Sequence, residues 1–399
     1  MRRALRQSGL RATVTIAALG TAALLTAGTS AFAASSTAST SSGTCASSAT
    51  ATTRVGGIAG IITAVNDSTG CAATLNSQAL SAAGNPAMGT PPLVWHGGAV
   101  MGTKLTGPLT VTPIFWNPAG HPMDPAYVSL ISQYWADVAK ASGQTNNVYS
   151  TATEYSGTDG SIVDKINLGT PINDTSPLPA SGCTLEAVDT TLIYADNTGY
   201  DACIDDSQVA AETNRVVHQD GLPIDFSHIY LLYTPKHVES CFFAGPTNTN
   251  QNACTINHLP SAAYCAYHTQ AGNSNIYGLL AYPIYHSPVH FTCGSDARVA
   301  GFGGVQSPNG NPDADVEISP SSHEVMEAWT DPDTTSGWFD ISGFENGDEC
   351  AYTYGPVSGT KGAFFNQTMN HHHYLTQEEF SNQSFFASGG GCIQGERFA

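Results

Sequence analysis

The chain has 399 residues, enough for one large domain or two ordinary domains. It carries 13 Lys and Arg against 32 Asp and Glu, a formal net charge of −19, which excludes binding to nucleic acid or anionic lipid through bulk electrostatics. Only 11% of residues are charged, so Ser, Thr, Asn and Gln must supply much of the polar surface, as is typical of an extracellular protein.

The N-terminus has the pattern of an export signal. Four arginines precede an apolar, Ala- and Leu-rich run at residues 12–27, and Ala31-Phe-Ala33 is a small-x-small cleavage signal. This predicts a secretory signal peptide over residues 1–33, too short for a spanning helix. No later run predicts a membrane span, so we expect a secreted protein. Residues 34–91, rich in Ser, Thr, Ala and Gly, predict an N-terminal extension before a single domain at 92–399.

The strands are predicted in runs of apolar and β-branched residues: 109–116, 192–194, 229–233, 276–282 and a closing strand at 374–380. A helix is predicted to start at Asp124-Pro125, since its apolar positions repeat with a 3.6-residue period as far as Val138. A second helix is predicted at residues 207–218. Strands and helices mix without strict alternation, which predicts an α+β fold with helices packed on a mixed sheet.

Ten cysteines predict a disulfide framework, because an even number in an exported chain is typical of disulfide-bonded proteins. None forms a C-x-x-C pair, which argues against a zinc ribbon. Proximity along the chain, which leaves other connectivities open, suggests the pairs Cys45–Cys71, Cys183–Cys203, Cys241–Cys254, Cys265–Cys293 and Cys350–Cys392.

The segment Ser319–Pro332 predicts a short helix with an unusual polar face. Ser319 is a good N-cap, Pro320 suits the first helical position, and Pro332 ends the helix. His323 and Glu327 are four residues apart, so both side chains lie on one face. The resulting H-E-x-x-E pattern resembles the H-E-x-x-H helix of metallopeptidases, with a carboxylate in place of the second histidine.

A hydrolytic zinc needs about three protein ligands, an open position for water and a nearby base. We expect His323, Glu327 and Glu345 to bind the metal and Glu324 to accept the proton from water. Three further residues are predicted as alternative ligands or as groups that orient the ligands: Asp331, Asp348 and His268. His268 is equally compatible with a structural role beside Cys265.

Two other interpretations remain open from the residues alone. H-E-x-x-E also occurs on solvated acidic helix faces, and the acids around it suit calcium as an alternative to zinc. The tract His371–His373 could bind metal, but neighbours in a strand point to opposite faces, so we favour a surface role. The chain has no G-x-S-x-G nucleophile elbow, which argues against a serine hydrolase.

An ordered series of motifs runs from about Pro92 to Cys392: Trp95-His-Gly-Gly98, Cys265-Ala-Tyr-His268, Ser307-Pro-Asn-Gly310, His323-Glu-Val-Met-Glu-Ala-x-Thr-Asp-Pro332, Gly337-Trp338, Glu345-x-x-Asp348-x-Cys350 and Tyr374-Leu-x-Gln377. The series resembles the Exordium-like (phosphate-induced protein) family of exported plant and bacterial proteins. The H-E helix within it suggests a zincin-like peptidase. The chain departs from the family at Gly98, where the family has proline, and at His371–His373, where it tends to have basic residues.

These observations lead to two hypotheses. The first is a secreted zinc metallopeptidase, disulfide-stabilised and zincin-like, which acts on an extracellular protein or cell-wall substrate through metal-activated water. The second is a non-enzymatic extracellular or cell-wall interaction protein, in which the acidic cluster holds a structural calcium ion or no metal.

Overall fold

The computed structural model describes residues 89–183, 185, 199–241, 254–255, 264–271, 275–283, 305–333 and 335–395, together with the backbone of short strands between residues 54 and 86. The chain divides into two units, Met1–Thr44 and Cys45–Ala399, and every described residue belongs to the second. The predicted signal peptide, the predicted strand at 192–194 and the cysteines Cys45, Cys71 and Cys293 lie outside the described residues.

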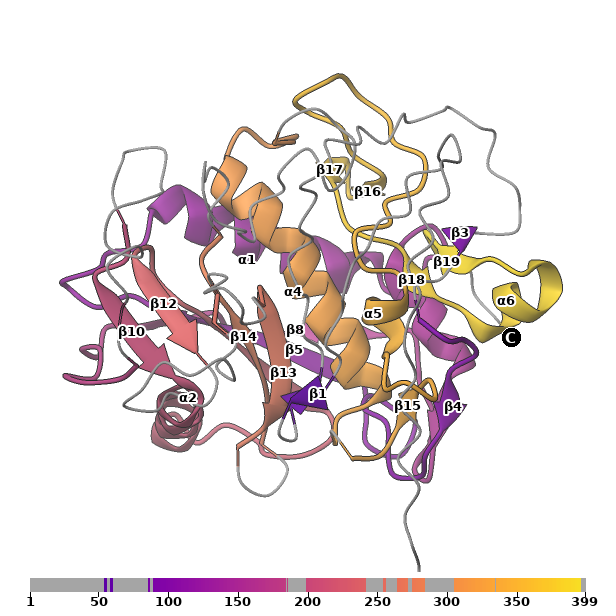
Figure 1. Cartoon of the computed structure of the whole chain (residues 1–399), viewed down its shortest axis with the longest axis horizontal. Coiled ribbons are helices and arrows are strands. Elements are labelled where there is room, and N and C mark those ends of the chain that lie inside the picture. Colours follow the sequence, from indigo (N-terminus) through magenta and orange to yellow (C-terminus); the bar gives the residue numbers. More distant parts are fainter. Residues whose placement is uncertain are drawn as a thin grey trace, which may run out of the picture. The chain divides into compact units, whose positions relative to one another are not determined.

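A mixed β-sheet lies at the centre of the second unit and confirms the α+β class (Figure 1). Its strand order is β1-β2-β13-β14-β11-β5-β8, and β9 also pairs with β5. Three strands at its centre are parallel to one another: β5 (Leu109–Trp116), β11 (His228–Tyr233) and β14 (Ile276–Leu280). The next strand, β13 (Ala266–Gln270), is antiparallel to β14. The predicted strands at 109–116, 229–233 and 276–282 are confirmed to within two residues.

The other strands of the described chain are short. They are β1 (Arg54–Val55), β2 (Ile58–Ala59), β3 (Asn85–Pro86), β4 (Val94–Trp95), β6 (Ser156–Gly157), β7 (Gly160–Ser161), β8 (Ile166–Leu168), β9 (Ile172–Asp174), β10 (Ala202–Asp205), β12 (Val238–Cys241), β15 (Trp338–Phe339), β16 (Gln367–Met369), β17 (His372–Tyr374), β18 (Glu379–Phe380) and β19 (Gly391–Ile393). A 3-10 helix at Val148–Glu154 and two short helices, α5 (Asn346–Glu349) and α6 (Asn382–Ser388), complete the described elements.

Helices α1 (Pro125–Ala141) and α2 (Asp206–Gln219) confirm the two predicted helices and begin with local caps. The Asp124 side chain accepts a hydrogen bond from Ala126 N, and a proline opens the first turn of α1. In α2, Asp205 and Gln208 form a capping box, in which each side-chain oxygen accepts a hydrogen bond from the backbone N–H of the other residue.

Helix α4 (Pro312–Thr330), which carries H-E-x-x-E, starts earlier than the sequence predicted. Asn311 accepts a hydrogen bond from Ala314 N, and Pro312 occupies the first turn, so a second cap-and-proline signal lies eight residues before the predicted one. Pro320 therefore lies inside the helix. A proline there costs about 3 kcal/mol, and packing offsets it, because every residue from Ala314 to Thr330 is buried.

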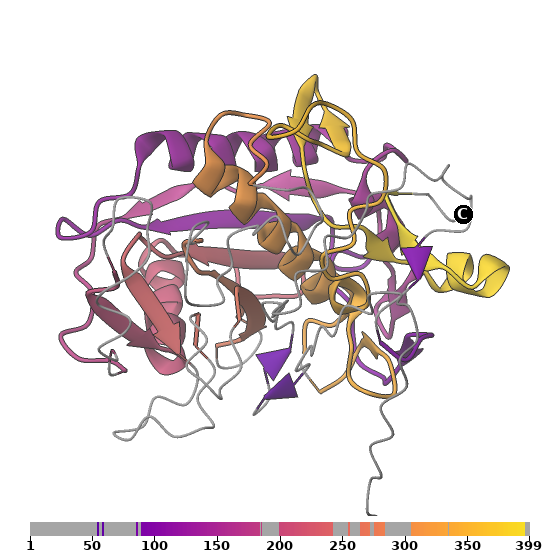
Figure 2. The same cartoon turned by 45° about the horizontal axis from the view of Figure 1, so that its top comes forward.

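Opposite faces of the sheet pack against different helices. In β11, Ile229, Leu231 and Tyr233 lie in the core with α1 and α4, whereas Tyr230 and Leu232 lie in the core with α2. This alternation is the two-residue period of a strand. Helices α1 (purple in Figure 2) and α4 (orange) thus cover one face, and α2 covers the other.

The predicted closing strand at 374–380 was wrong as a continuous element, since β17 ends at Tyr374 and β18 begins at Glu379. Two backbone N–H groups between them bond to side chains instead of a neighbouring strand. Thr376 N donates to Asn366 Oδ1 at 3.1 Å, and Gln377 N donates to Ser319 Oγ at 3.0 Å. This detour places Gln377 against α4.

Short strands from the predicted N-terminal extension join the sheets of the predicted main domain. Strand β2 pairs with the edge of β13, where Ala59 lies opposite His268. Strand β3 pairs with β19, where Asn85 lies opposite Cys392. Strands β2 and β3 therefore contribute main-chain pairing to two different sheets.

Three of the predicted disulfides are confirmed: Cys183–Cys203, Cys241–Cys254 and Cys350–Cys392. Cys265 is also disulfide-bonded. Among the helices of the described chain, none combines the length and hydropathy that a bilayer span requires.

Candidate metal centre

Helix α4 places His323, Glu324 and Glu327 side by side in the protein interior. All three side chains have no exposed surface, although isolated charged groups are costly to bury. One donor atom from each of the three lies within 4.8 Å of the others. The spacing that predicted a common face thus produces a compact group of nitrogen and oxygen donors.

The Glu327 carboxylate lies between two histidines. Its Oε1 is 2.9 Å from His323 Nε2, and its Oε2 is 3.6 Å from Nδ1 of His268. His323 comes from the same helix, one turn earlier, whereas His268 comes from β13 beside it. A histidine of β13 and a histidine of α4, which lie far apart in the sequence, therefore meet at one carboxylate.

His268 is held on both ring nitrogens. Nδ1 lies 3.2 Å from Glu324 Oε2, and Nε2 lies 2.9 Å from the backbone oxygen of Asp331. Because a carbonyl oxygen only accepts, Nε2 donates to Asp331, and Nδ1 donates to the ionised Glu324 carboxylate. Histidines that bind metal commonly donate their other ring N–H to such an acceptor. Asp331 therefore contacts His268 through its backbone carbonyl.

Helix α5 supplies two further carboxylates. Glu345, the residue before α5, has a donor oxygen within 4.8 Å of donors on His268 and Glu327. Asp348 Oδ1 lies 3.8 Å from His323 Nε2, and Asp348 N donates to Glu327 Oε1 at 2.9 Å. Both carboxylates are fully buried. The structure therefore brings together all seven site residues that the sequence predicted.

Gly347 of α5 packs directly on the His323 ring. A Cβ at this position would lie 2.6 Å from His323 Nδ1, closer than real contacts allow. The same nitrogen lies 2.9 Å from Gln377 Nε2, which also donates to Gly347 O at 2.7 Å. An amide nitrogen donates, so with this amide orientation a neutral His323 ring carries its proton on Nε2, toward Glu327. A cation on Nε2 would replace this proton and requires the amide to turn its oxygen toward Nδ1.

Burial and mutual contacts shift the pKa values of this group. Burial lowers the pKa of His268, but the hydrogen bond to Glu324 and the negative charges of Glu324 and Glu327 raise it to about 10. Burial acts in the same way on His323, and the charge of Glu327 raises its pKa to about 9. Burial raises the pKa of Glu324 to about 8. Burial also raises the pKa of Glu327, but the positive charges of His323 and His268 lower it to about 2.

Several donor atoms at the centre are buried without a hydrogen-bond partner. These atoms are Oε1 of Glu324, Oε2 of Glu327 and Oδ1 of Asp348. Buried polar atoms in proteins are normally satisfied, so these oxygens are compatible with a cation as their partner. Two imidazoles with carboxylates are a donor set that suits zinc, whereas calcium prefers six to eight oxygens. The residues present therefore fit zinc.

Three buried residues near the centre were not predicted. Gln377 orients His323, although its place in the Tyr374-Leu-x-Gln377 motif gave no role. Glu317 lies two helical turns before Glu324, a spacing that could have revealed it. Glu379 has both carboxylate oxygens buried without a partner, and burial, followed by the charges of Glu327 and Glu324, raises its pKa well above the ordinary value.

Other polar clusters lie apart from this centre. His372, about half exposed, contacts buried Asp137 at 2.6 Å, and His373 stacks on Phe365, so the tract has two separate environments. Two more groups of possible donors combine Glu239 with cysteines or consist of cysteines alone, but those cysteines form disulfides. They therefore lack the thiolates that a metal requires.

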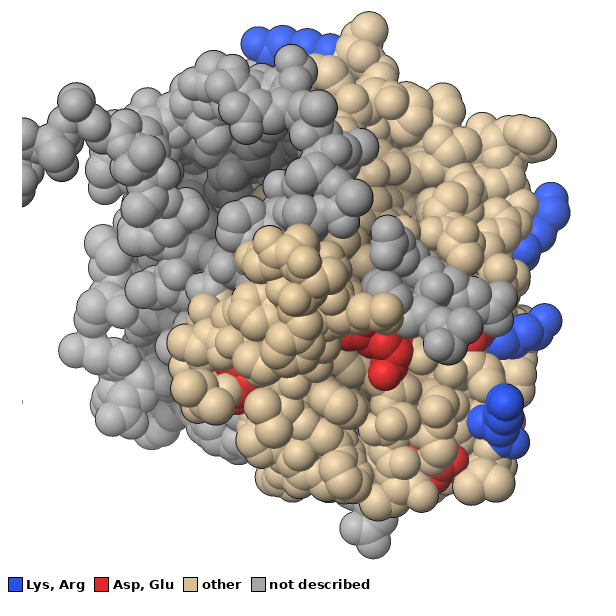
Figure 3. Space-filling model, turned by 90° about the vertical axis from the view of Figure 1, so that its right-hand side faces the viewer, with Lys and Arg blue, Asp and Glu red and all other residues tan. Residues whose placement is uncertain are grey.

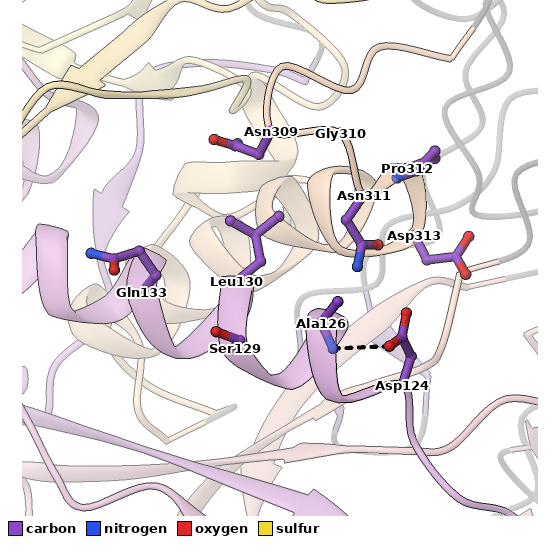
Figure 4. A pocket seen from close by; sticks show the side chains of 10 residues that line it. All are labelled: Asp124, Ala126, Ser129, Leu130, Gln133, Asn309, Gly310, Asn311, Pro312 and Asp313. Atoms are coloured by element: carbon purple, nitrogen blue, oxygen red, sulfur yellow. Dashed lines mark hydrogen bonds between the residues drawn. The ribbon is translucent and has the colours of Figure 1, made fainter.

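A surface pocket of about 560 Å³ lies between the N-terminal ends of α1 and α4 (Figure 4). Its lining residues are Asp124, Ala126, Ser129, Leu130, Gln133, Asn309, Gly310, Asn311, Pro312 and Asp313. None of them belongs to the candidate metal centre. Figure 3 shows another face, where acidic side chains form small separate patches on a largely uncharged surface.

Comparisons of the chain with protein-family models, with curated proteins and with solved structures gave no match. The Exordium-like resemblance therefore stays a prediction made from the motifs, and the function is argued from the geometry of the centre.

Proposed function

We propose that the protein is a metal-dependent hydrolase, most simply a secreted zinc peptidase of zincin-like and Exordium-like character. One observation carries the proposal: a buried carboxylate, Glu324, adjoins a group of His and Glu donors, and Oε1 of Glu324 and Oε2 of Glu327 are buried without hydrogen bonds. Such a pairing of base and metal ligands is what hydrolysis of a carbonyl compound by water requires.

Bound zinc would supply Lewis acidity and lower the pKa of water to about 7. His323, Glu327 and Glu345 would hold the metal, with His268 as a further donor. Glu324 would accept the proton of the attacking water and pass it to the leaving group. Burial favours the protonated form of Glu324, which brings its pKa close to neutral and suits both steps.

The orientation of the ligands comes from neighbouring groups that do not react. The Asp331 carbonyl fixes the His268 ring, and Gln377 and Gly347 fix the His323 ring. Such partners typically change metal affinity by 10- to 100-fold when removed.

A second candidate function is favoured by one observation, the complete burial of every donor. Closed sites are typical of structural metals, whereas catalytic sites keep an open position. In this case the ion would brace α4 against β13 and α5 in an extracellular interaction protein.

The experiment that separates the candidates uses the full-length chain purified without chelator. We expect bound zinc by elemental analysis and zinc-dependent cleavage of unfolded casein, which Glu324→Gln abolishes while zinc is retained. Zinc without cleavage of any unfolded protein, and with a large loss of thermal stability on chelation, would establish the structural role instead.

A further inference from the structure

We infer that the centre binds two divalent cations, bridged by the carboxylate of Glu327. This inference rests on the proposed function, because it concerns the same site. Its basis is that the two oxygens of one side chain face two different histidines, His323 through Oε1 and His268 through Oε2. Two-metal hydrolytic sites hold their ions about 3.5–4 Å apart, a separation that one carboxylate spans.

The first position lies among His323, Glu327 and Asp348. Ligand atoms around a tetrahedral zinc with bonds of 2.0–2.1 Å are about 3.3 Å apart. The distances from His323 Nε2 to Glu327 Oε1, 2.9 Å, and to Asp348 Oδ1, 3.8 Å, bracket this value. Asp348 Oδ1 is buried and has no hydrogen-bond partner, as expected of an oxygen that binds a cation.

The second position lies among His268, Glu327 and Glu345. Donor atoms of these three residues all lie within 4.8 Å of one another. His268 donates Nε2–H to the Asp331 carbonyl, so Nδ1 would bind the ion after losing its proton. This nitrogen lies 3.2 Å from Glu324 Oε2 and 3.6 Å from Glu327 Oε2. Glu345 Oε2 lies 4.0 Å from Nε2 of the same ring. Glu327 Oε2 is likewise buried and without a hydrogen bond. The two positions share Glu327 and no other residue.

Charge balance favours two ions over one. The three ligand carboxylates of Glu327, Glu345 and Asp348 bring three negative charges when they bind metal, and histidines that bind metal are neutral. One divalent ion leaves one of these charges unbalanced, whereas two ions balance all three. Buried charges without compensation are strongly destabilising, so the interior is more stable with the second ion.

The same geometry explains the carboxylate at position 327. An imidazole one turn after His323 would offer a single ring nitrogen to the site and could serve only one ion. A carboxylate offers two oxygens pointing in different directions and can join two ions. The departure from H-E-x-x-H is thus the feature that a shared ligand requires. Glu324 also has a donor oxygen within 4.8 Å of donors on His323 and Glu327, and we assign it the role of base and not of ligand.

The test measures metal stoichiometry and metal–metal coupling in the full-length chain. Metal-free protein is titrated with Zn²⁺ and, separately, with Mn²⁺, and the Mn²⁺ form is studied by electron paramagnetic resonance. We expect two ions per chain and an exchange-coupled Mn²⁺ spectrum. His268→Ala should retain one ion and lose the coupling. His228→Ala, which removes a surface histidine bound to Asp225, should leave both unchanged.

Other outcomes overturn the inference in distinguishable ways. A single ion at saturation, or two ions without exchange coupling, would show that Glu327 does not bridge two ions. The proposed zinc hydrolase would still stand if Glu324→Gln abolishes cleavage. Absence of metal binding in the wild-type chain overturns the bridge and the proposed function together.

Discussion

His268 Nε2 lies 2.9 Å from the carbonyl oxygen of Asp331, the residue that ends α4. This bond connects the edge region of the sheet to the helix that carries H-E-x-x-E. Because the acceptor belongs to the backbone, the ring is positioned by the place where the helix stops and not by a side chain. The end of α4 at Thr330 is therefore part of the geometry of the centre.

Glu324→Gln should retain bound metal and reduce turnover by about 10²- to 10⁴-fold, the usual contribution of a general base. Glu327→Gln, an equally conservative change one turn later, should lose metal, because an amide is a poor substitute for the shared carboxylate. Elemental analysis and casein cleavage on the same samples separate the two effects. Full activity of Glu324→Gln would show that this carboxylate is not the base.

Gly347→Ala should weaken metal binding by about 10- to 100-fold, the range seen when groups that orient a ligand are disturbed. The added Cβ would lie 2.6 Å from His323 Nδ1 and must displace the ring. Gly120→Ala is the matched control, since nothing lies within 4 Å of its Cβ position. Competition titration with a chromophoric chelator measures both affinities, and equal values for the two variants would contradict the contact.

The metal-free protein should lose stability as the pH rises from about 6 to 10. The pKa values of His268 and His323 are raised in the folded protein to about 10 and 9 from an ordinary 6.5, so their stabilisation is complete below pH 6.5 and is lost through these values. Burial raises the pKa of Glu324 to about 8, so its ionisation above about pH 4.5 destabilises in the same direction.

Thermal unfolding at a series of pH values measures this dependence. Zinc-loaded protein is the control, because its ligands are already deprotonated, and its Tm should change little between pH 7 and 9. A Tm of the metal-free protein that stays constant or rises from pH 6 to 10 would contradict the arrangement of these groups.

Replacing Cys350 and Cys392 together by serine should cost about 4 kcal/mol of stability, because their bond closes 42 residues. It should also weaken metal binding, since Cys350 directly follows α5. Removing Cys241–Cys254, which closes 13 residues, should cost about 3 kcal/mol and spare metal binding. Denaturant unfolding and metal titration of both variants test the difference, which would be refuted by equal effects on affinity.

The sequence predicted those parts of the fold whose signals are local. The proline at the start of α1 and the β-branched runs of β5 and β11 are signals that span only a few neighbouring residues. The start of α4 was misplaced because two cap-and-proline signals, at Asn311 and Ser319, compete, and only burial of the whole helix selects the first.

For the centre, spacing on one helix predicted the grouping of His323, Glu324 and Glu327. The distances to Glu345 and Asp348 depend on how α5 folds back, which no local pattern specifies. The role of Gln377 was hidden for a similar reason. It arises because the backbone leaves the strand pattern to bond with Ser319.

The burial of the donors also has a kinetic consequence. No donor side chain of the centre has exposed surface, so an ion held there can exchange only when part of the fold opens. The rate at which a strong chelator strips the metal should then be independent of chelator concentration and equal to an opening rate. The rate of metal loss would then measure the rate of local unfolding around α4.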